Sequence, residues 1–186
     1  PPQVPPGWGR QPSGLRRHLQ RTGAAPALPG TRVAYDILHQ TTDAELLARA
    51  TIWAGANPRA RDQIFNITNG DQFRWAQLWP QFAEHFGMDY AAPQQMSLSD
   101  AMPTRGDVWT SLVRKYDLVD TPFDQLVAWP VGDFLFHHEA DNITSTIKAR
   151  QAGFADALDT PSRLLDLFDE LIAMKVLPPT LSAAEH

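Results

Sequence analysis

The side chains best suited to chemistry in this 186-residue sequence stand together at His137, His138, Glu139 and Asp141. Imidazole and carboxylate groups can bind a metal ion or move a proton. Adjacent histidines on a helix, however, point about 100° apart, whereas helical ligand pairs are spaced three or four residues apart. We therefore predict a solvated polar edge at these residues and no metal site.

A second candidate is Asp133, which lies inside the apolar run from Trp129 to Phe136. A carboxylate among apolar side chains needs a hydrogen-bond partner to offset its desolvation. A structural cap, or a hydrogen bond in a pocket wall, is therefore favoured over an acid–base role. The sequence contains no Gly-x-Ser-x-Gly elbow, Walker loop or His-Glu-x-x-His motif, and we predict no catalytic residue in it.

Composition argues against several classes of function. The formal net charge is −5 and the isoelectric point is near 5.6, whereas a nucleic-acid partner would require a basic stripe. No apolar run approaches the length that crosses a membrane, so no membrane partner is expected. The absence of cysteine excludes disulfides and thiolate ligands, and it favours the reducing cytoplasm.

The elements that would position these side chains follow a proline-rich start. Residues 1–30 are rich in proline and arginine, contain no acidic residue and show no periodicity, so we predict an irregular segment. Asp43 is predicted to cap a helix over 44–56, which Asn57 ends because a proline follows it. The β-branched and aromatic residues over 63–68 predict a short strand.

The next stretch is predicted to turn sharply and then form a helix over 73–86. Asn69-Gly70 tolerates the positive φ of a tight turn, and Asp71 is placed to cap the helix. Pro80 should bend the helix because it removes one hydrogen bond. The apolar residues follow one helical face, so we predict that they are core residues: Trp75, Leu78, Trp79, Phe82 and Phe86.

The remainder of the chain is predicted to be mostly helical. A proline and a glycine interrupt the apolar run 126–136, and helices are predicted over 144–151, ending at Gly153, and over 161–175. A lone strand at 63–68 cannot form a sheet, because its backbone groups need neighbouring strands. We therefore expect poorly paired edges there, and an exposed apolar face where a missing part of the fold would dock.

Three stretches resemble one known series. They are Asp43-Ala-x-Leu-Leu-Ala, Ile64-Phe-Asn-Ile-Thr-Asn-Gly-Asp-x-Phe-Arg-Trp75, and Lys148-Ala-Arg-x-Ala-Gly-Phe154. From about Pro29 to Pro178 the chain resembles the C-terminal half of extended short-chain dehydrogenase/reductases, in the progesterone 5-beta-reductase and iridoid synthase-like branch. Each motif is weak by itself, and the combination is specific.

The resemblance implies an α/β fold that is mostly α in this chain. It implies the trailing strand and helices of a Rossmann-type sheet over 31–92, a helical substrate-binding lobe over 93–179 and a tail over 180–186. It places four residues near substrate: Trp129, Val131, Asp133 and Phe134. The family usually has an aromatic residue where this chain has Val131, which implies a wider or altered pocket.

For full-length members the resemblance further implies NADP as cofactor and a small apolar carbonyl substrate, and it leaves a homodimer open. Pro2 and Gln3 resemble the loop that closes over the nicotinamide end. The phosphate loop and the catalytic Tyr–Lys pair of the family are missing, since the only Gly-x-Gly has Pro12 in place of the third glycine. The tyrosines Tyr35, Tyr90 and Tyr116 have no lysine four residues later.

Residues 14–28 also depart from the family, which has a helix there. We hypothesise that this part is translated out of frame, and the alternative is a natural basic, proline-rich tail. The leading functional hypothesis is the substrate-binding portion of an NAD(P)H-dependent reductase of activated C=C or C=O bonds, inactive as this isolated chain. The alternative is a non-catalytic helical interaction module derived from the same lobe.

Overall fold

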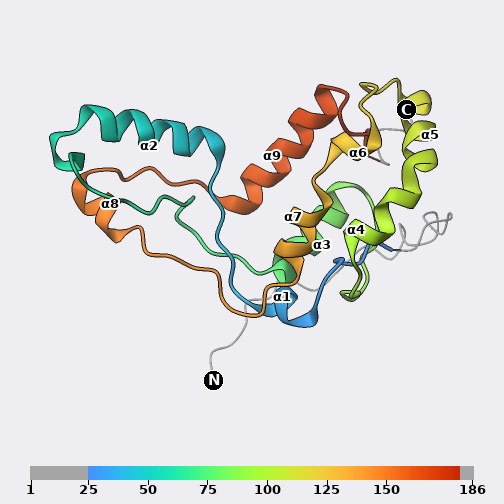
Figure 1. The fold of residues 1–186 in the computed structure, drawn as a ribbon, viewed down its shortest axis with the longest axis horizontal. Coiled ribbons are helices and arrows are strands. Elements are labelled where there is room, and N and C mark those ends of the chain that lie inside the picture. The colour runs from blue at the N-terminus through green and yellow to red at the C-terminus, as the bar shows by residue number, and fades with distance from the viewer. Residues whose placement is uncertain (1–24, 181–186) are drawn as a thin grey trace, which may run out of the picture.

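The structure is a computed structural model that describes residues 25–180. It shows an elongated molecule with α2 and α8 at one end and most of the other helices at the opposite end (Figure 1). Among the described residues, β-type pairing is limited to three isolated bridges, Ala27 with Ala91 and His39 with both Phe73 and Asn142. The helices are α1 (Arg32–Asp36), α2 (Ala44–Ala56), η2 (Pro58–Ala60), α3 (Trp75–His85), α4 (Leu98–Ala101), η3 (Met102–Arg105), α5 (Gly106–Tyr116), α6 (Phe123–Leu126), α7 (Trp129–Phe136), α8 (Ile147–Ala152) and α9 (Thr160–Ala173).

Helix α2 begins and ends where the sequence predicts. The Asp43 side chain accepts hydrogen bonds from the Glu45 and Leu46 amides at 2.8 and 3.1 Å. These two amides are among the donors that every helix start leaves without a partner inside the helix. At the other end Asn57 leaves the helical region, with φ −99° and ψ 119°, as a residue before proline should. The predicted helix over 44–56 is confirmed.

A small apolar core joins α2 to residues that follow about a hundred positions later. Leu46 and Ala50 of α2 are buried together with Ala149 of α8 and Phe154. Burying a large apolar side chain contributes about 1.5–3 kcal/mol, so this cluster ties the two stretches together. The partly buried residues packed against it are Trp53, Phe65, Ile67 and Leu158. These contacts cross residue 92, where a domain boundary is predicted from the sequence. The division into two domains stays a prediction.

The strand predicted over 63–68 forms no sheet in the structure. The Gln63 amide donates to Ala60 O just after α2, and the Asn69 amide donates to Thr41 O just before α2. The segment therefore returns along a helix of 13 residues, about 20 Å long, in six steps that reach at most about 3.3 Å each. Only an extended backbone can do this. Within residues 25–180 the amides of 64–68 have no backbone acceptor, so the expected poor pairing is confirmed.

Helix α3 is found where it is expected, but its predicted cap is wrong. The residue before the helix is Arg74, which makes no side-chain capping bond. Asp71 lies too far upstream to cap it, and its carboxylate instead accepts hydrogen bonds from the Thr160 amide and hydroxyl at 2.8 and 2.6 Å. It thereby fixes the start of α9. Gly70 has φ +104°, which confirms the predicted sharp turn.

The apolar face of α3 packs against α7 and α9, mainly through aromatic rings. Leu78 is 1% exposed, and the prediction that it is a core residue is confirmed. The other four predicted core residues are only partly buried: Trp75, Trp79, Phe82 and Phe86. Their rings contact Phe136 of α7 and Phe168 of α9 at centroid distances between 4.9 and 6.2 Å. This face is therefore an interface between three helices.

Part of the predicted irregular N-terminal segment is packed in the structure. Of the predicted irregular segment 1–30, residues 25–30 are described and packed, and Leu28 is fully buried. The predicted interruption of 126–136 is found at Val127 and Ala128, between α6 and α7, and not at the predicted proline and glycine. Pro130 lies in the first turn of α7, and Gly132 lies inside it. Gly153 ends α8 in the left-handed conformation, as predicted, with φ 110°.

Candidate functional site

Helix α7 carries all four residues that the resemblance places near substrate. Val131 and Phe134 expose 55% and 65% of their surface, and Leu135 exposes 40%. Trp129 is partly buried, with its ring 5.4 Å from that of Phe123 on α6. The sequence alone would bury an apolar helix such as this, yet one of its sides is uncovered. The exposed side is an apolar strip, which we call the α7 face: Val131, Phe134 and Leu135.

Asp133 points away from this strip and caps helix α4. Its carboxylate accepts hydrogen bonds from the Leu98 amide at 2.6 Å, the Ser99 amide at 2.9 Å and the Ser99 hydroxyl at 2.6 Å. The Ser97 hydroxyl donates a longer bond of 3.4 Å. These donors, the Ser99 hydroxyl first, lower the pKa of Asp133 to about 2. The structural cap that the sequence favours is what the structure shows.

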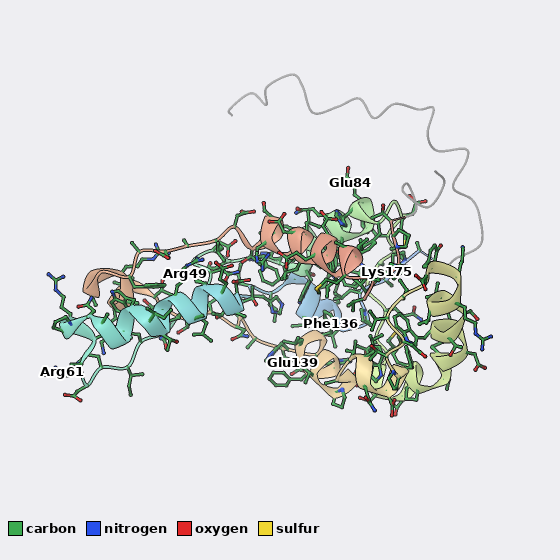
Figure 2. All side chains as sticks on the ribbon, turned by 90° about the horizontal axis from the view of Figure 1, so that it is seen from above. Arg49, Arg61, Glu84, Phe136, Glu139 and Lys175 are labelled. Carbon is green, nitrogen blue, oxygen red and sulfur yellow. The ribbon has the colours of Figure 1, made fainter. Side chains whose placement is uncertain are left out.

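Close packing holds α7 against its neighbours. A Cβ atom added to Gly132 would lie 2.7 Å from the Leu98 side chain on α4, so only glycine allows this approach without a shift. A Cβ atom added to Gly30 would lie 2.2 Å from the carbonyl oxygen of Phe136, which also accepts the Thr31 amide at 3.1 Å. Figure 2 places Phe136 near the middle of the molecule. The orientation of the α7 face is therefore fixed from both ends.

The solvated edge predicted after α7 is found at Glu139 and Asp141, which are exposed, but not at the histidine pair. His137 and His138 are both half-buried, and Glu139 is exposed. His137 Nδ1 lies 2.7 Å from the backbone oxygen of Asp133, and the His138 ring packs 4.6 Å from that of Phe134. Both contacts join residues four positions apart, the spacing of one helical turn, so the two imidazoles lie against the last turn of α7. Within residues 25–180 no three His, Asp or Glu side chains come close enough to share a metal ion.

The described residues do not fit a dinucleotide. A dinucleotide site needs glycines whose backbone is open to a pyrophosphate at a helix start. Gly30, Gly70 and Gly132 instead lie against Phe136, Arg150 and Leu98. Gly55 is open but lies inside α2. Gly106 is open at the start of α5, but it is a single glycine directly after η3 and belongs to no Gly-x-Gly loop. The predicted nicotinamide-side residues Pro2 and Gln3, like the Gly-x-Gly before Pro12, lie outside the described residues. None of the helices in residues 25–180 combines the length and apolarity needed to cross a membrane.

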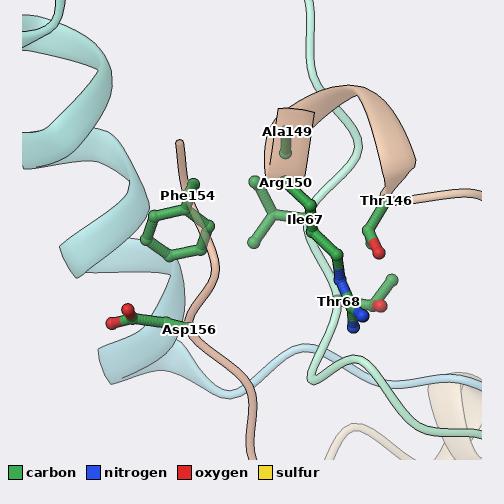
Figure 3. A pocket seen from close by; sticks show the side chains of 7 residues that line it. All are labelled: Ile67, Thr68, Thr146, Ala149, Arg150, Phe154 and Asp156. Atoms are coloured by element: carbon green, nitrogen blue, oxygen red, sulfur yellow. The ribbon is translucent and has the colours of Figure 1, made fainter. Parts of the chain in front are cut away.

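Two cavities in the described part of the chain lie away from α7. The first has a volume of about 10 Å³ between α8 and the extended segment, which is room for a single water molecule (Figure 3). Its lining residues are Ile67, Thr68, Thr146, Ala149, Arg150, Phe154 and Asp156. A substrate or cofactor needs several hundred Å³, so this cavity is a packing gap.

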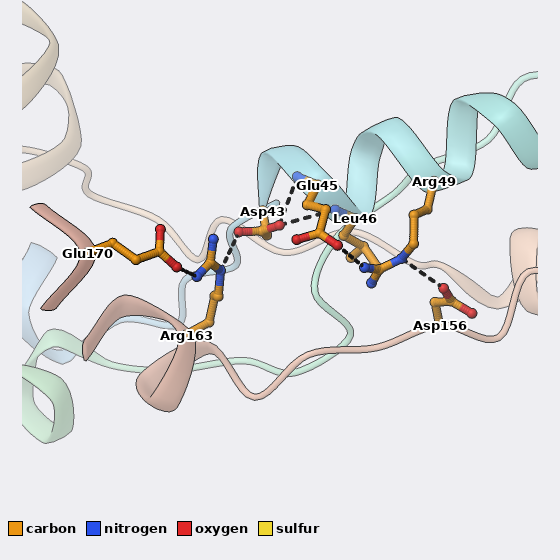
Figure 4. Close-up of polar contacts among 7 residues, drawn as sticks. All are labelled: Asp43, Glu45, Leu46, Arg49, Asp156, Arg163 and Glu170. Carbon is orange, nitrogen blue, oxygen red and sulfur yellow. Dashed lines mark hydrogen bonds and ion pairs between the residues drawn. The ribbon is translucent and has the colours of Figure 1, made fainter. Parts of the chain in front are cut away.

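The second cavity, about 330 Å³, lies between the start of α2 and α9. The charged groups of its lining all have partners. Arg163 donates to Asp43 at 2.8 Å and to Glu170, outside the lining, at 2.7 Å (Figure 4). Glu45 accepts from Arg49 at 2.9 Å. The hydrogen bond from Arg163 lowers the pKa of the Asp43 carboxyl. Sequence reasoning missed this ion-pair network, because Asp43 and Arg163 are 120 positions apart and no motif links them. It connects two helices and leaves no charge free for a ligand.

Comparison with known proteins confirms the resemblance. Residues 13–178 match the family described as PRISE-like Rossmann-fold domain, so the match begins inside the predicted irregular segment. A (S)-8-oxocitronellyl enol synthase of Nepeta cataria is 33% identical over 164 residues, which cover 86% of this chain and 41% of that protein. The relatives of the same name in Camptotheca acuminata and Catharanthus roseus are 32% and 29% identical, over 39% of their length. The chain thus spans about two fifths of the relatives it matches.

Proposed function

The chain belongs to the family of PRISE-like Rossmann-fold domains, and from this premise we propose that it supplies the substrate-side wall of an NAD(P)H-dependent reductase of activated C=C or C=O bonds. The observation that carries the proposal is the α7 face. Val131 and Phe134 are exposed on a helix that Asp133 holds in one orientation. Pockets for small apolar ligands are lined mainly by such side chains. An apolar carbonyl compound is the substrate class that this wall suits.

The residues have different roles in this proposal. Trp129, Val131 and Phe134 contact the apolar body of the substrate, and the smaller Val131 leaves space that an aromatic side chain would fill. Asp133 orients the wall through its bonds to α4, because those bonds already occupy its carboxylate. Hydride transfer needs NADP, which supplies the hydride when bound, and a donor for the developing negative charge. We propose that the described residues supply neither a cofactor site nor this donor.

Two measurements on the purified chain test the proposal. We expect no saturable change in NADPH fluorescence at micromolar cofactor and no NADPH oxidation with a simple enone. In two-dimensional NMR, the apolar enone carvone should shift the indole signal of Trp129 and leave that of Trp53 unchanged. Phe134→Ser should abolish this shift, and Ile52→Ser, at a site 73% exposed on α2, should not.

Several outcomes would contradict this assignment. Cofactor binding or turnover would show that the chain contains a site that its glycines and tyrosines do not indicate. A carvone shift that survives Phe134→Ser would move the binding surface away from α7. The absence of any shift, with the chain folded, would favour the alternative of a helical interaction module that binds a protein through the same exposed residues.

A further inference from the structure

Asn69 and Gly70 form a dipeptide that can modify itself. The side-chain amide of an asparagine is attacked by the backbone nitrogen of the next residue, and the attack is fastest before glycine, which has no Cβ to hinder the approach. The other asparagines of the chain are followed by proline, at Asn57, or by isoleucine, at Asn66 and Asn142. A proline nitrogen carries no hydrogen, and a β-branched side chain crowds the approach. The reaction is therefore expected at Asn69.

The folded chain bonds every polar group of Asn69, which is only 2% exposed. Its backbone amide donates to Thr41 O at 2.9 Å, and its backbone oxygen accepts the Leu158 amide at 2.8 Å. Its side-chain Oδ1 accepts the Asp43 amide at 2.7 Å, and Nδ2 donates to the Thr160 hydroxyl oxygen at 3.0 Å. We call these residues the Asn69 junction. It joins the start of α2 to the start of α9, and its bonds keep the side chain from turning toward the next backbone nitrogen.

The attacking atom, Gly70 N, is restrained as well. It donates to the Thr68 hydroxyl at 3.3 Å. Gly70 has φ +104°, and a Cβ atom added to it would lie 2.7 Å from the Arg150 side chain and 3.1 Å from the Ala157 Cβ. The turn therefore requires glycine, and the junction requires asparagine, which offers both an acceptor and a donor on one short side chain. Together these requirements place a labile dipeptide here, and the surrounding bonds suppress its reaction.

We propose that Asn69-Gly70 is a self-modification site that is closed in the folded chain and reacts when the Asn69 junction opens. In this reaction Gly70 N gives up its proton and bonds to Cγ of Asn69. The Cγ–Nδ2 bond breaks, and Nδ2 leaves as ammonia. Water then opens the resulting cyclic imide at either of its two carbonyl carbons. The product is an aspartate or an isoaspartate, and the reaction needs no oxidant, reductant or enzyme.

The product cannot rebuild the junction. A carboxylate in place of the Asn69 amide keeps an oxygen that accepts from Asp43 but loses the donor to Thr160. The Thr160 hydroxyl has a single hydrogen, which it already gives to Asp71 at 2.6 Å, so its oxygen would face two carboxylates. A buried charge with too few donors is unfavourable. An opening that leads to reaction is therefore recorded permanently, because the modified chain no longer holds α2 to α9 through this side chain.

The test compares the folded chain with the chain unfolded in urea, both kept at mildly alkaline pH. Peptide mass spectrometry measures the mass gain at each asparagine. In urea we expect modification at Asn69 and none at Asn66 or Asn142 over the same time. In the folded chain the rate at Asn69 should be lower by about 100-fold or more, because reaction then requires the junction to open. The inference does not rest on the proposed function, since the junction does not include α7.

Two variants make the test specific to the junction. Thr160→Val removes the oxygen that accepts from Asn69 Nδ2 and keeps the branched shape, so it should raise the rate in the folded chain by about tenfold. The rate in urea should stay unchanged. Thr51→Val is the matched control, because Thr51 is exposed and its hydroxyl donates within α2, to Leu47 O at 2.8 Å. It should change neither rate.

Asn69→Asp tests the consequence directly, because it installs the carboxylate without the reaction. At the urea midpoint of the parent chain, we expect the ratio of unfolded to folded Asn69→Asp chain to be about tenfold higher than for the parent. Asn66→Asp is the control, because Asn66 is exposed and its amide makes only a longer bond, to Ser145 O at 3.3 Å. It should change the ratio by less than about threefold.

Each of the following results would overturn the inference. They are equal rates at Asn69 in the folded and unfolded chains, equal rates in folded Thr160→Val and Thr51→Val chains, and an Asn69→Asp chain as stable as the parent. If Thr160→Val does not fold, the dependence of the parent's rate on urea decides. That rate should rise with the unfolded fraction through the transition, and a rate that stays constant would contradict the proposal.

Discussion

Replacing Asp43 tests whether one side chain both starts α2 and joins it to α9. The Asp43 carboxylate accepts two capping bonds, from the Glu45 and Leu46 amides, and one ion-paired bond from Arg163 at 2.8 Å. Its side chain is 5% exposed and that of Arg163 is 22% exposed, so water replaces these bonds poorly. Asp43→Ala removes all three bonds. Asp43→Asn keeps the two capping bonds, because asparagine caps as well as aspartate, and it loses the bond from Arg163, because its amide nitrogen is a donor.

The two variants should therefore differ by the value of the cap. Loss of an N-cap costs about 1 kcal/mol, and loss of a partly buried, charge-assisted bond costs about 1–2 kcal/mol. Arg163 keeps Glu170 as a partner at 2.7 Å, which holds the second figure near its lower end. We expect Asp43→Ala to lower the free energy of unfolding by about 2 kcal/mol and Asp43→Asn to lower it by about 1 kcal/mol.

Unfolding in urea, monitored by far-ultraviolet circular dichroism, measures both changes. The slope of the free energy of unfolding against urea concentration should be the same for both variants and the parent chain. Asp159→Ala is the matched control, because Asp159 caps α9 through the Ser162 amide at 3.0 Å and has no cationic partner within residues 25–180. It should cost about 1 kcal/mol. Equal losses for the alanine and asparagine variants of Asp43 would refute the capping role, and a loss below about 0.5 kcal/mol for both would refute the reasoning altogether.

Two further predictions concern the placement of α7. Gly30→Ala should destabilise the chain by about 1–3 kcal/mol, because its Cβ would meet Phe136 O at 2.2 Å. Gly55→Ala, whose Cβ would meet nothing within 4 Å, should stabilise α2 by about 0.5–1 kcal/mol. Equal urea midpoints for the two variants would contradict this prediction. Asp133 has its pKa lowered to about 2, so its contribution to stability should be complete above about pH 4 and be lost as pH falls towards 2. Asp133→Asn should remove this part of the acid unfolding profile, and an unchanged profile would contradict the bond set at α4.

Local signals predicted the start and end of α2 correctly, because its cap and its terminator are adjacent to it in sequence. Asp43 is followed directly by the amides it caps, and Asn57 precedes the proline that ends the helix. Gly153 likewise ends α8 through its own backbone conformation, which needs no distant partner. Where a single residue decides the local backbone, sequence reasoning is sufficient.

Several of the wrong predictions involve partners that are distant in sequence. Asp71 has the residue type of a cap, but its donor is Thr160, 89 positions later. The segment 63–68 has the composition of a strand, but a strand is defined by its neighbours. The burial of Trp75 and Phe82 depends on rings from two other helices, and their periodicity indicates only which side faces inward. Composition and spacing carry no information about these long-range contacts.

The candidate site shows the same limit, with a consequence for mechanism. Resemblance groups Asp133 with Val131 and Phe134, because all three stand within one turn of α7. The structure separates them: the two apolar side chains are exposed, and the carboxylate is occupied by the amides and hydroxyls at the start of α4. A carboxylate that keeps a pKa of about 2 cannot donate a proton near neutral pH. If α7 forms a substrate wall, it therefore orients an apolar molecule by contact alone, and any proton donor in the reaction must come from residues other than Asp133.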